Sequence, residues 1–260
     1  METIVLITGA NRAGVGIGQG LVARYLRNDN NTVVIAACRD ASPERTEHLR
    51  ALPRGPNCRL IVLPLRLDQP DSLGHACRLL QRQHQIWRID VVVANAGICD
   101  HYGPLAAMTD ADLQAHLDVN TVGPLRLFRA MRPFLLPPAT DRRPLHHPPR
   151  FVYVSTELAS LAGLEQHRAS LTTAYGMSKA AGNYLVRRVH LEHEDLICFS
   201  VDPGLVQTDM GNRGAHAKGL EMAPLTVDQS VDGIVQQIDR ATRLTTSGRF
   251  LRHNGEQLPW

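Results

Sequence analysis

Two side chains with complementary proton chemistry, Tyr175 and Lys179, stand four residues apart in a run, 172–192, whose pattern predicts a helix. On a helix this spacing places both side chains on one face. A phenol has an ordinary pKa of about 10 and exchanges its proton poorly at neutral pH. A nearby ammonium favours the phenolate, lowers that pKa and makes Tyr175 a usable proton donor or acceptor. The same spacing also arises by chance on amphipathic helices, so the rest of the chain must decide between the two interpretations.

Short apolar runs rich in β-branched residues recur along the chain and alternate with helical patterns. The early runs are almost continuously apolar, which is typical of parallel strands buried on both faces. The alternation predicts an α/β Rossmann fold, a doubly wound parallel sheet of about seven strands with helices on both faces, in a single domain over 1–260. The predicted strands are 4–8, 32–37, 59–63, 90–94, 151–155, 197–201 and 248–251, and the predicted helices are 17–28, 70–84, 109–135, 172–192 and 226–243.

A glycine-rich turn joins the first strand to the first helix. Glycines let the backbone approach a pyrophosphate closely, and the helix N-terminus supplies free N–H groups and the positive end of a dipole. In this position the turn predicts a dinucleotide site at the carboxyl ends of the strands. The candidate contacts are Gly9, Asn11, Arg12, Gly16 and Gly18.

The end of the second strand bears on the choice of cofactor. A carboxylate there usually holds free ribose hydroxyls, whereas a 2′-phosphate favours an arginine. Cys38 is small and neutral and Arg39 follows it, which predicts NADPH. Asp40 leaves NAD as the alternative, because its carboxylate reaches a ribose if the loop turns inward.

The third and fourth strands end in further candidate contacts. Asp68 is placed to accept a hydrogen bond from an adenine amino group. Asn95, Ala96 and Gly97 are small enough at the backbone to let a ribose lie against them. Both patterns also occur in ordinary turns.

Composition narrows the class of partner. The net charge is +3 and no basic run is interleaved with aromatic residues, so nothing points to a nucleic-acid partner. No apolar run is long enough to span a membrane, so no membrane partner is expected. The five cysteines are scattered without a C-x-x-C pair, which is typical of thiols in a reducing compartment. We therefore expect a cytoplasmic protein with a small-molecule substrate. The adjacent His146 and His147 lack helical or hairpin spacing, so no metal site is predicted.

Together these motifs resemble the short-chain dehydrogenase/reductase family, in its order and spacing over essentially the whole chain, and most closely fungal reductases of the norsolorinic acid ketoreductase type. The resemblance implies that Tyr175 is the proton donor and that Lys179 lowers its pKa and holds the nicotinamide ribose. Asn120 would bend its helix and hold a water in a proton relay. The other residues that the resemblance assigns to the cofactor are Ile17, Pro203, Gly204, Val206 and Thr208.

Two positions depart from the family pattern. The serine that polarises the substrate carbonyl is matched by Thr156, whose hydroxyl can still donate although its methyl group crowds the site. Ser155, Ser160 and an impaired site are the alternatives. The glycine-rich turn is also two residues longer between Arg12 and Gly16.

The function predicted by this set of motifs is NADPH-dependent reduction of a ketone or aldehyde, with an aromatic polyketide as one possible substrate. One alternative is a nucleotide-binding regulatory protein of weak or no activity. Another is alcohol oxidation, epimerisation or dehydration by the same residues. The resemblance further implies a homodimer or homotetramer formed through the helices 109–135 and 172–192.

Overall fold

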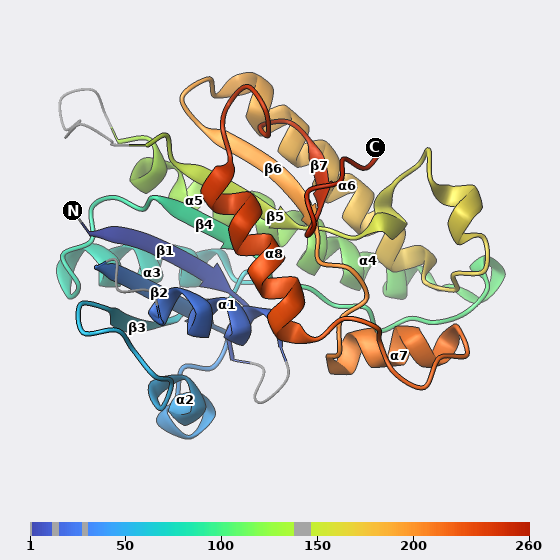
Figure 1. Ribbon diagram of the computed structural model, residues 1–260, viewed down its shortest axis with the longest axis horizontal. Coiled ribbons are helices and arrows are strands. Elements are labelled where there is room, and N and C mark those ends of the chain that lie inside the picture. Colours follow the sequence, from blue (N-terminus) through green and yellow to red (C-terminus); the bar gives the residue numbers. More distant parts are fainter. Residues whose placement is uncertain (1, 12–15, 28–30, 138–146) are drawn as a thin grey trace.

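A computed structural model of the protein describes residues 2–11, 16–27, 31–137 and 147–260 (Figure 1). Its centre is one seven-stranded sheet in the order β3-β2-β1-β4-β5-β6-β7, and all six pairings are parallel. This confirms the predicted α/β fold and its doubly wound sheet. The strands are β1 Thr3–Thr8, β2 Thr32–Cys38, β3 Arg59–Pro64, β4 Val91–Ala94, β5 Arg150–Val154, β6 Ile197–Asp202 and β7 Phe250–Arg252.

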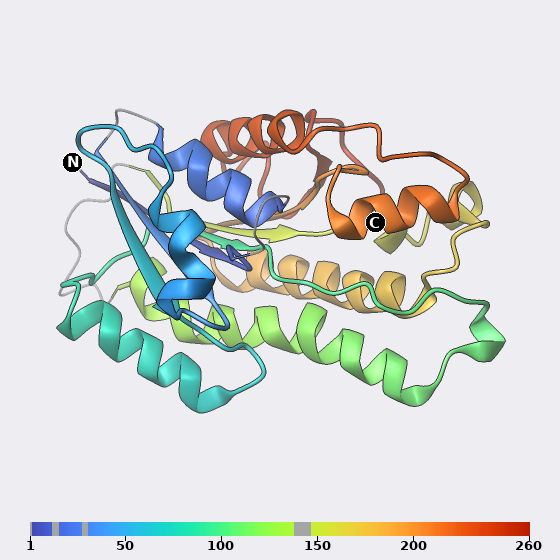
Figure 2. The same cartoon turned by 90° about the horizontal axis from the view of Figure 1, so that it is seen from below.

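Helices cover both faces of the sheet because successive strand residues point to opposite sides. Ile4 and Leu6 of β1 pack toward α3, α5 and α6, whereas Val5 and Ile7 pack toward α1 and α8 (Figure 2). No helix within the described ranges is long and apolar enough to cross a membrane. The helices of the two layers are α3 Pro70–Arg82, α5 Gly123–Leu135 and α6 Thr173–Glu192 on one face, and α1 Ile17–Leu26 and α8 Val227–Arg240 on the other.

Three helical features differ from the prediction. The predicted helix 109–135 is divided into α4 (Asp110–Leu117), a π-helical turn η2 (Asp118–Val122) and α5. The helix α2 (Pro43–Arg50) was not predicted, because only two of its eight residues are buried and it carries no apolar periodicity. The helix α7 (Asp209–Ala217) was also not predicted, because its glycines disfavour a helix that the Thr208 cap nevertheless starts. Two short 3₁₀ turns follow β5, η4 Glu157–Ala159 and η5 Leu164–His167.

The strand order reverses between β1 and β4, and side chains fix this point. The backbone N–H groups of Asn95 and Ala96 both donate to the Thr8 hydroxyl at 3.0 Å. The Asn95 side-chain amide donates to the Thr8 carbonyl at 2.8 Å. The carboxyl ends of the two central strands are thus held together, and ligands of such sheets bind at this place.

Close packing sets the position of α6 on the sheet. Gly182 faces Tyr153 of β5, and a Cβ at Gly182 would lie 2.3 Å from the Tyr153 hydroxyl oxygen. That hydroxyl donates to the Asn120 carbonyl at 2.7 Å and so joins β5 to η2. The absence of a side chain at Gly182 therefore lets α6 approach the strand that precedes the candidate catalytic residues.

We predict that Gly182→Ala destabilises the fold by about 2–3 kcal/mol, because the added methyl overlaps a fully buried ring. Chemical denaturation measures the change. Gly74→Ala in α3 is the matched control, since its Cβ would meet only the tip of Arg78 at 3.5 Å and the change should be neutral or stabilising. Equal stabilities of the two variants would contradict this account of α6 packing.

Candidate active site

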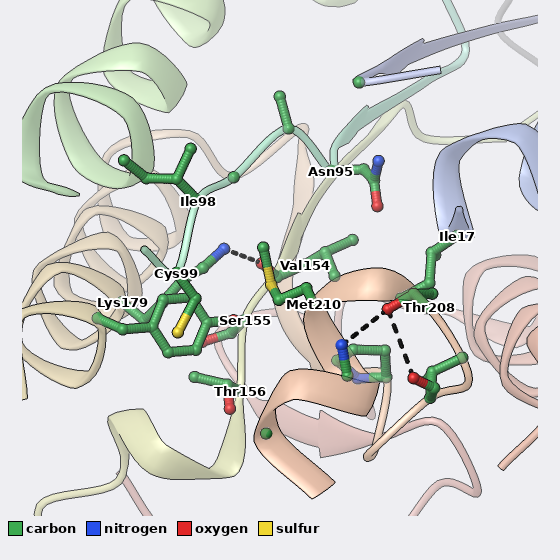
Figure 3. A pocket seen from close by; sticks show the side chains of 18 of the residues that line it. Ile17, Asn95, Ile98, Cys99, Val154, Ser155, Thr156, Lys179, Thr208 and Met210 are labelled. Atoms are coloured by element: carbon green, nitrogen blue, oxygen red, sulfur yellow. Dashed lines mark hydrogen bonds between the residues drawn. The ribbon is translucent and has the colours of Figure 1, made fainter. Parts of the chain in front are cut away.

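A cavity of about 310 Å³ opens at the carboxyl edge of the sheet (Figure 3). It runs from the ends of β2 and β3 past the glycine-rich turn to β5 and α6. Arg12 lies outside the described residues, and Asn120 does not line the cavity. The structure brings the remaining predicted residues together along its wall: Gly9, Asn11, Gly16, Ile17, Gly18, Arg39, Asp68, Asn95, Ala96, Gly97, Thr156, Tyr175, Lys179, Pro203, Gly204, Val206 and Thr208.

The residues at the start of α1 fit the pyrophosphate of a nicotinamide cofactor. Gly16 is the N-cap of α1, and among the described residues no side chain caps the helix there. The N-terminus of such a helix offers backbone N–H groups and the positive end of the helix dipole to an anion. A Cβ at Gly18 would lie 2.3 Å from the Gly9 carbonyl oxygen and 2.7 Å from the Asn95 amide nitrogen. The backbone at Gly9, the segment after β4 and the start of α1 are therefore packed closely together, as in sites where the backbone binds a phosphate. We call this arrangement the phosphate cradle.

Two carboxylates at the ends of β2 and β3 are turned in different ways. Asp40 accepts the Ser42 N–H at 3.0 Å and is not among the residues that line the cavity. Asp68 lines the cavity and pairs with Arg66 at 2.8 Å. Since Arg39 lines the cavity while Asp40 does not, this end of the site offers a cation where a cofactor with free ribose hydroxyls would need a carboxylate.

Lys179 is buried in the floor of the site. Its side chain is 3% exposed, and its Nζ donates to the Val154 carbonyl at 2.7 Å (Figure 3). The nitrogen lies 4.7 Å from the centre of the Tyr153 ring and 5.8 Å from that of Tyr175. Burial lowers the pKa of Lys179 from 10.5 to about 7, so this amine gives up its proton readily at neutral pH.

The pKa of Tyr175 is raised, not lowered as the sequence analysis predicted. Burial is the main cause, and the negative charges that Cys99 and Asp202 can carry act in the same direction. A hydrogen bond with Thr156 opposes the rise. The prediction assumed a fully charged ammonium beside the phenol, whereas Lys179 is itself desolvated. In the folded protein Tyr175 is thus a neutral phenol that keeps its proton.

The three candidate hydroxyl groups after β5 lie in different places. Thr156 lines the cavity and lowers the pKa of Tyr175, and its Oγ1 accepts the Leu158 N–H at 3.3 Å. Ser155 is buried and donates to Asn183 of α6 at 2.7 Å. Ser160 accepts the Gly163 N–H at 3.0 Å and does not line the cavity. Thr156 and Ser155 both line the cavity, but the Ser155 hydroxyl hydrogen is donated to Asn183, so the Thr156 hydroxyl is the candidate for a substrate oxygen.

Asn120 lies in η2, the π-helical turn that interrupts the predicted helix 109–135 at the place where the resemblance implied a bend. It is completely buried in η2, and its side chain bonds both backbone groups of Ile98, at 2.9 Å each. It also donates to Ser178 at 3.0 Å, and its carbonyl accepts from Tyr153. The side chain therefore holds the loop after β4 against α6 and does not face the cavity. A water held by Asn120 in a proton relay remains a prediction.

The segment after β6 forms the opposite wall. The Thr208 hydroxyl accepts the Gly211 N–H at 3.0 Å and so caps α7, which extends over the cavity (Figure 3). Cys99, Tyr102 and Met210 line the cavity but were not among the predicted site residues. Cys99 and Tyr102 reach the site through the loop after β4, and Met210 reaches it from the first turn of α7, a helix that the sequence analysis did not predict.

Comparison with known proteins agrees with this geometry. The model of the short chain dehydrogenase family matches residues 3–218, and the chain belongs to this family of oxidoreductases. Norsolorinic acid ketoreductase of Aspergillus parasiticus is 39% identical over 100% of this chain and 92% of its own length. The short chain dehydrogenase gsfK of Penicillium aethiopicum is 38% identical over 100% of both.

Two solved structures have the same fold along the whole chain. The NADPH-bound carbonyl reductase from chicken fatty liver superposes with a TM-score of 0.83 at 28% identity, covering 100% of each chain. The carbonyl reductase Sniffer of Drosophila melanogaster gives 0.81 at 26% identity with the same coverage. The chain therefore has the fold of a family that uses a nicotinamide cofactor, and its cradle at α1 fits one.

The lowered pKa of Lys179 predicts a pH-dependent stability. Between about pH 7 and 10.5 the unfolded chain carries this proton and the folded chain does not, so the contribution of Lys179 to stability rises with pH. Lys179→Met removes the contribution. The variant should lose stability relative to wild type by roughly 1.4 kcal/mol per pH unit across this window. Denaturant unfolding at pH 7, 8.5 and 10 measures the slope, and a constant difference would contradict a desolvated amine.

Proposed function

We propose that the protein is an NADPH-dependent reductase of an apolar ketone or aldehyde. The observation that carries the proposal is a neutral phenol, a hydrogen-bonded threonine and a buried amine in one cavity that also has a phosphate cradle. Two of its relatives carry matching names, a ketoreductase and a carbonyl reductase that binds NADPH.

The chemistry divides between the cofactor and the protein. A bound nicotinamide cofactor supplies the hydride that reduces the carbonyl carbon. Tyr175 donates its proton to the carbonyl oxygen, a role that suits a phenol held in its protonated form. Thr156 stabilises the negative charge that develops on this oxygen. Lys179 holds the cofactor ribose and, with a pKa near 7, can return a proton to Tyr175 after turnover.

The walls of the cavity favour an apolar substrate. Next to the candidate catalytic residues they consist largely of hydrocarbon and sulfur side chains, and Cys99 and Val206 are buried. Such surfaces bind apolar or aromatic molecules, and the few hydroxyl groups in the wall set the orientation of the bound molecule. An aromatic polyketide, the substrate that the resemblance implied, fits this description, and two relatives are named as ketoreductases of norsolorinic acid. The wall residues are Ile98, Cys99, Leu158, Leu171, Leu205, Val206 and Met210.

The preference for NADPH rests on Arg39. A guanidinium binds a 2′-phosphate through charge-assisted hydrogen bonds that NADH cannot make. The Asp40 carboxylate, which would favour NADH, is engaged by Ser42.

A homodimer or homotetramer remains part of the proposal. Met177, Tyr184 and Leu191 recur every seven residues along α6 and are 47%, 70% and 59% exposed. Residues seven apart lie on one side of a helix, so α6 carries an apolar stripe of the kind that subunit contacts bury. Cytoplasmic localisation likewise remains a prediction.

The proton-donor role of Tyr175 is tested by Tyr175→Phe. The variant should lose turnover by at least about 10³-fold because no group replaces the acid, while NADPH affinity changes little. Thr156→Val should lose about 10²-fold, whereas the control Thr156→Ser keeps the hydroxyl and stays within about 10-fold of wild type. Oxidation of NADPH is followed with a panel of aromatic and aliphatic ketones and quinones. Full activity of Tyr175→Phe, or a wild type that reduces none of them, would refute the proposal.

The role of Arg39 is tested by Arg39→Ala. The dissociation constant for NADPH should rise by about 10-fold or more, and that for NADH should hardly change, because only the 2′-phosphate contact is lost. Arg45, a neighbouring arginine on α2 that does not line the cavity, provides the control substitution Arg45→Ala. Equal losses for both cofactors in Arg39→Ala would argue against NADPH selection by this residue.

A further inference from the structure

Asp202 is a buried carboxylate that the proposed mechanism does not use. It ends β6 immediately before Pro203, and it is 2% exposed. One carboxylate oxygen accepts the backbone N–H of Glu157 at 3.0 Å. The other accepts the backbone N–H of Gly204 at 3.2 Å. A single side chain thus joins the turn that carries Thr156 to the segment that forms the opposite wall of the cavity.

We propose that Asp202 is a positioning residue that clamps the Thr156 turn and the Gly204 segment in their reactive arrangement. The inference rests on the proposed function, since it assigns the clamp to the reaction of the same site. Glu157 follows Thr156 directly, so a displaced Glu157 amide moves the hydroxyl that faces the substrate oxygen. A misplacement of about 1 Å at a reacting group costs about 10²-fold in rate.

The surroundings of Asp202 make the clamp sensitive to charge. Burial raises the pKa of this carboxyl to about 7, and the negative charge of Glu157 adds to the rise. The two N–H donors and Arg252 oppose it. Arg252 in turn pairs with Glu157 at 3.0 Å and with Glu256 at 2.6 Å. The groups around the clamp are Glu157 of η4, His167 of η5, Tyr175 of α6, Arg252 of β7, and His253 and Glu256 after it.

The two histidines differ in their relation to the clamp. His253 donates its backbone N–H to the Asp202 carbonyl at 2.8 Å, and burial lowers the pKa of its ring, which therefore gains a proton less readily than an ordinary imidazole. His167 Nδ1 lies 3.9 Å from a carboxylate oxygen of Glu157, the residue whose backbone N–H Asp202 accepts. Below about pH 7 Asp202 itself gains a proton, and the protonated oxygen becomes a donor facing an N–H. The clamp therefore closes fully only as the pH rises through about 7.

The test is the pH profile of Asp202→Asn. The amide has the size of the carboxylate but can accept only one of the two N–H groups, because its NH₂ faces the other. We expect kcat/KM for carbonyl reduction to fall by about 10- to 100-fold at pH 8.5. The ratio of wild type to variant should approach one below pH 6, where wild-type Asp202 is also protonated. The control is Asp232→Asn, an exposed partner of Arg24 on the far helix α8, which should match wild type at every pH.

A ratio that does not change with pH would overturn the proposal, because a purely structural defect would act equally at all pH values. If Asp202→Asn does not fold, Glu157→Gln serves instead. Removing this neighbouring charge lowers the pKa of Asp202, so the rise of kcat/KM with pH should move to lower pH. An unshifted profile in a folded Glu157→Gln variant would likewise overturn the proposal.

Amide hydrogen exchange separates the clamp from the proposed function, since it needs no substrate. At pH 8 the amide of Glu157 or Gly204 should exchange faster in Asp202→Asn than in wild type and in Asp232→Asn. Faster exchange together with a wild type that reduces no carbonyl would support the clamp and refute the function. Unchanged exchange at both amides, with a wild type that does reduce carbonyls, would refute the clamp alone.

Discussion

Removal of water from a phenol and an amine is the constraint on which the site depends. Tyr175 and Lys179 lie beneath the loop after β4 and against the end of β5, where neither charged form is well solvated. Burial changes the two pKa values in opposite directions. It raises the pKa of the phenol, which keeps its proton, and lowers the pKa of the amine, which loses its proton more easily. At neutral pH the pair therefore consists of a phenol that is fully protonated, although a weaker acid than a free tyrosine, and an amine that exchanges protons. This division of roles suits reduction, which consumes a proton at the substrate oxygen.

The fold imposes this desolvation through contacts that lie outside the cavity. Gly182 brings α6 onto the Tyr153 ring, and the Tyr153 hydroxyl fixes the carbonyl of Asn120 in the π-helical turn. Asn120 then holds Ile98 over the pair with two hydrogen bonds. On the other side Asp202 joins the Thr156 turn to Gly204. The cavity is thus enclosed by a few buried polar groups that cannot shift independently.

Much of this arrangement could be predicted from the sequence. Continuous apolar runs indicated the parallel sheet, and the polar residues at the strand ends indicated which edge binds a ligand. The helical spacing of Tyr175 and Lys179 placed them in one cavity, which Thr156 and Ser155 also line and Ser160 does not. The role of Thr156 toward the substrate oxygen remains a prediction.

What could not be predicted depends on tertiary contacts without a local pattern. The direction of the Tyr175 pKa shift was wrong, because spacing gives proximity but not the depth of burial. Asn120 faces Ile98 and not the cavity, because a π-helical turn rotates its side chain inward. The position of Asp202 next to Glu157 arises only where β6 ends beside the turn after β5. Each of these features joins segments that are far apart in the sequence.

The most direct test of the central claim is a titration of the Tyr175 phenol. Phenolate absorbance near 295 nm, measured on the cofactor-free wild type and Tyr175→Phe, gives the ionisation of this one residue by difference. The account predicts that Tyr175 contributes no phenolate signal at any pH up to about 10, the pKa of an ordinary tyrosine. A difference signal with a midpoint near pH 7 or 8 would show that the neighbouring amine outweighs burial, and it would contradict the account.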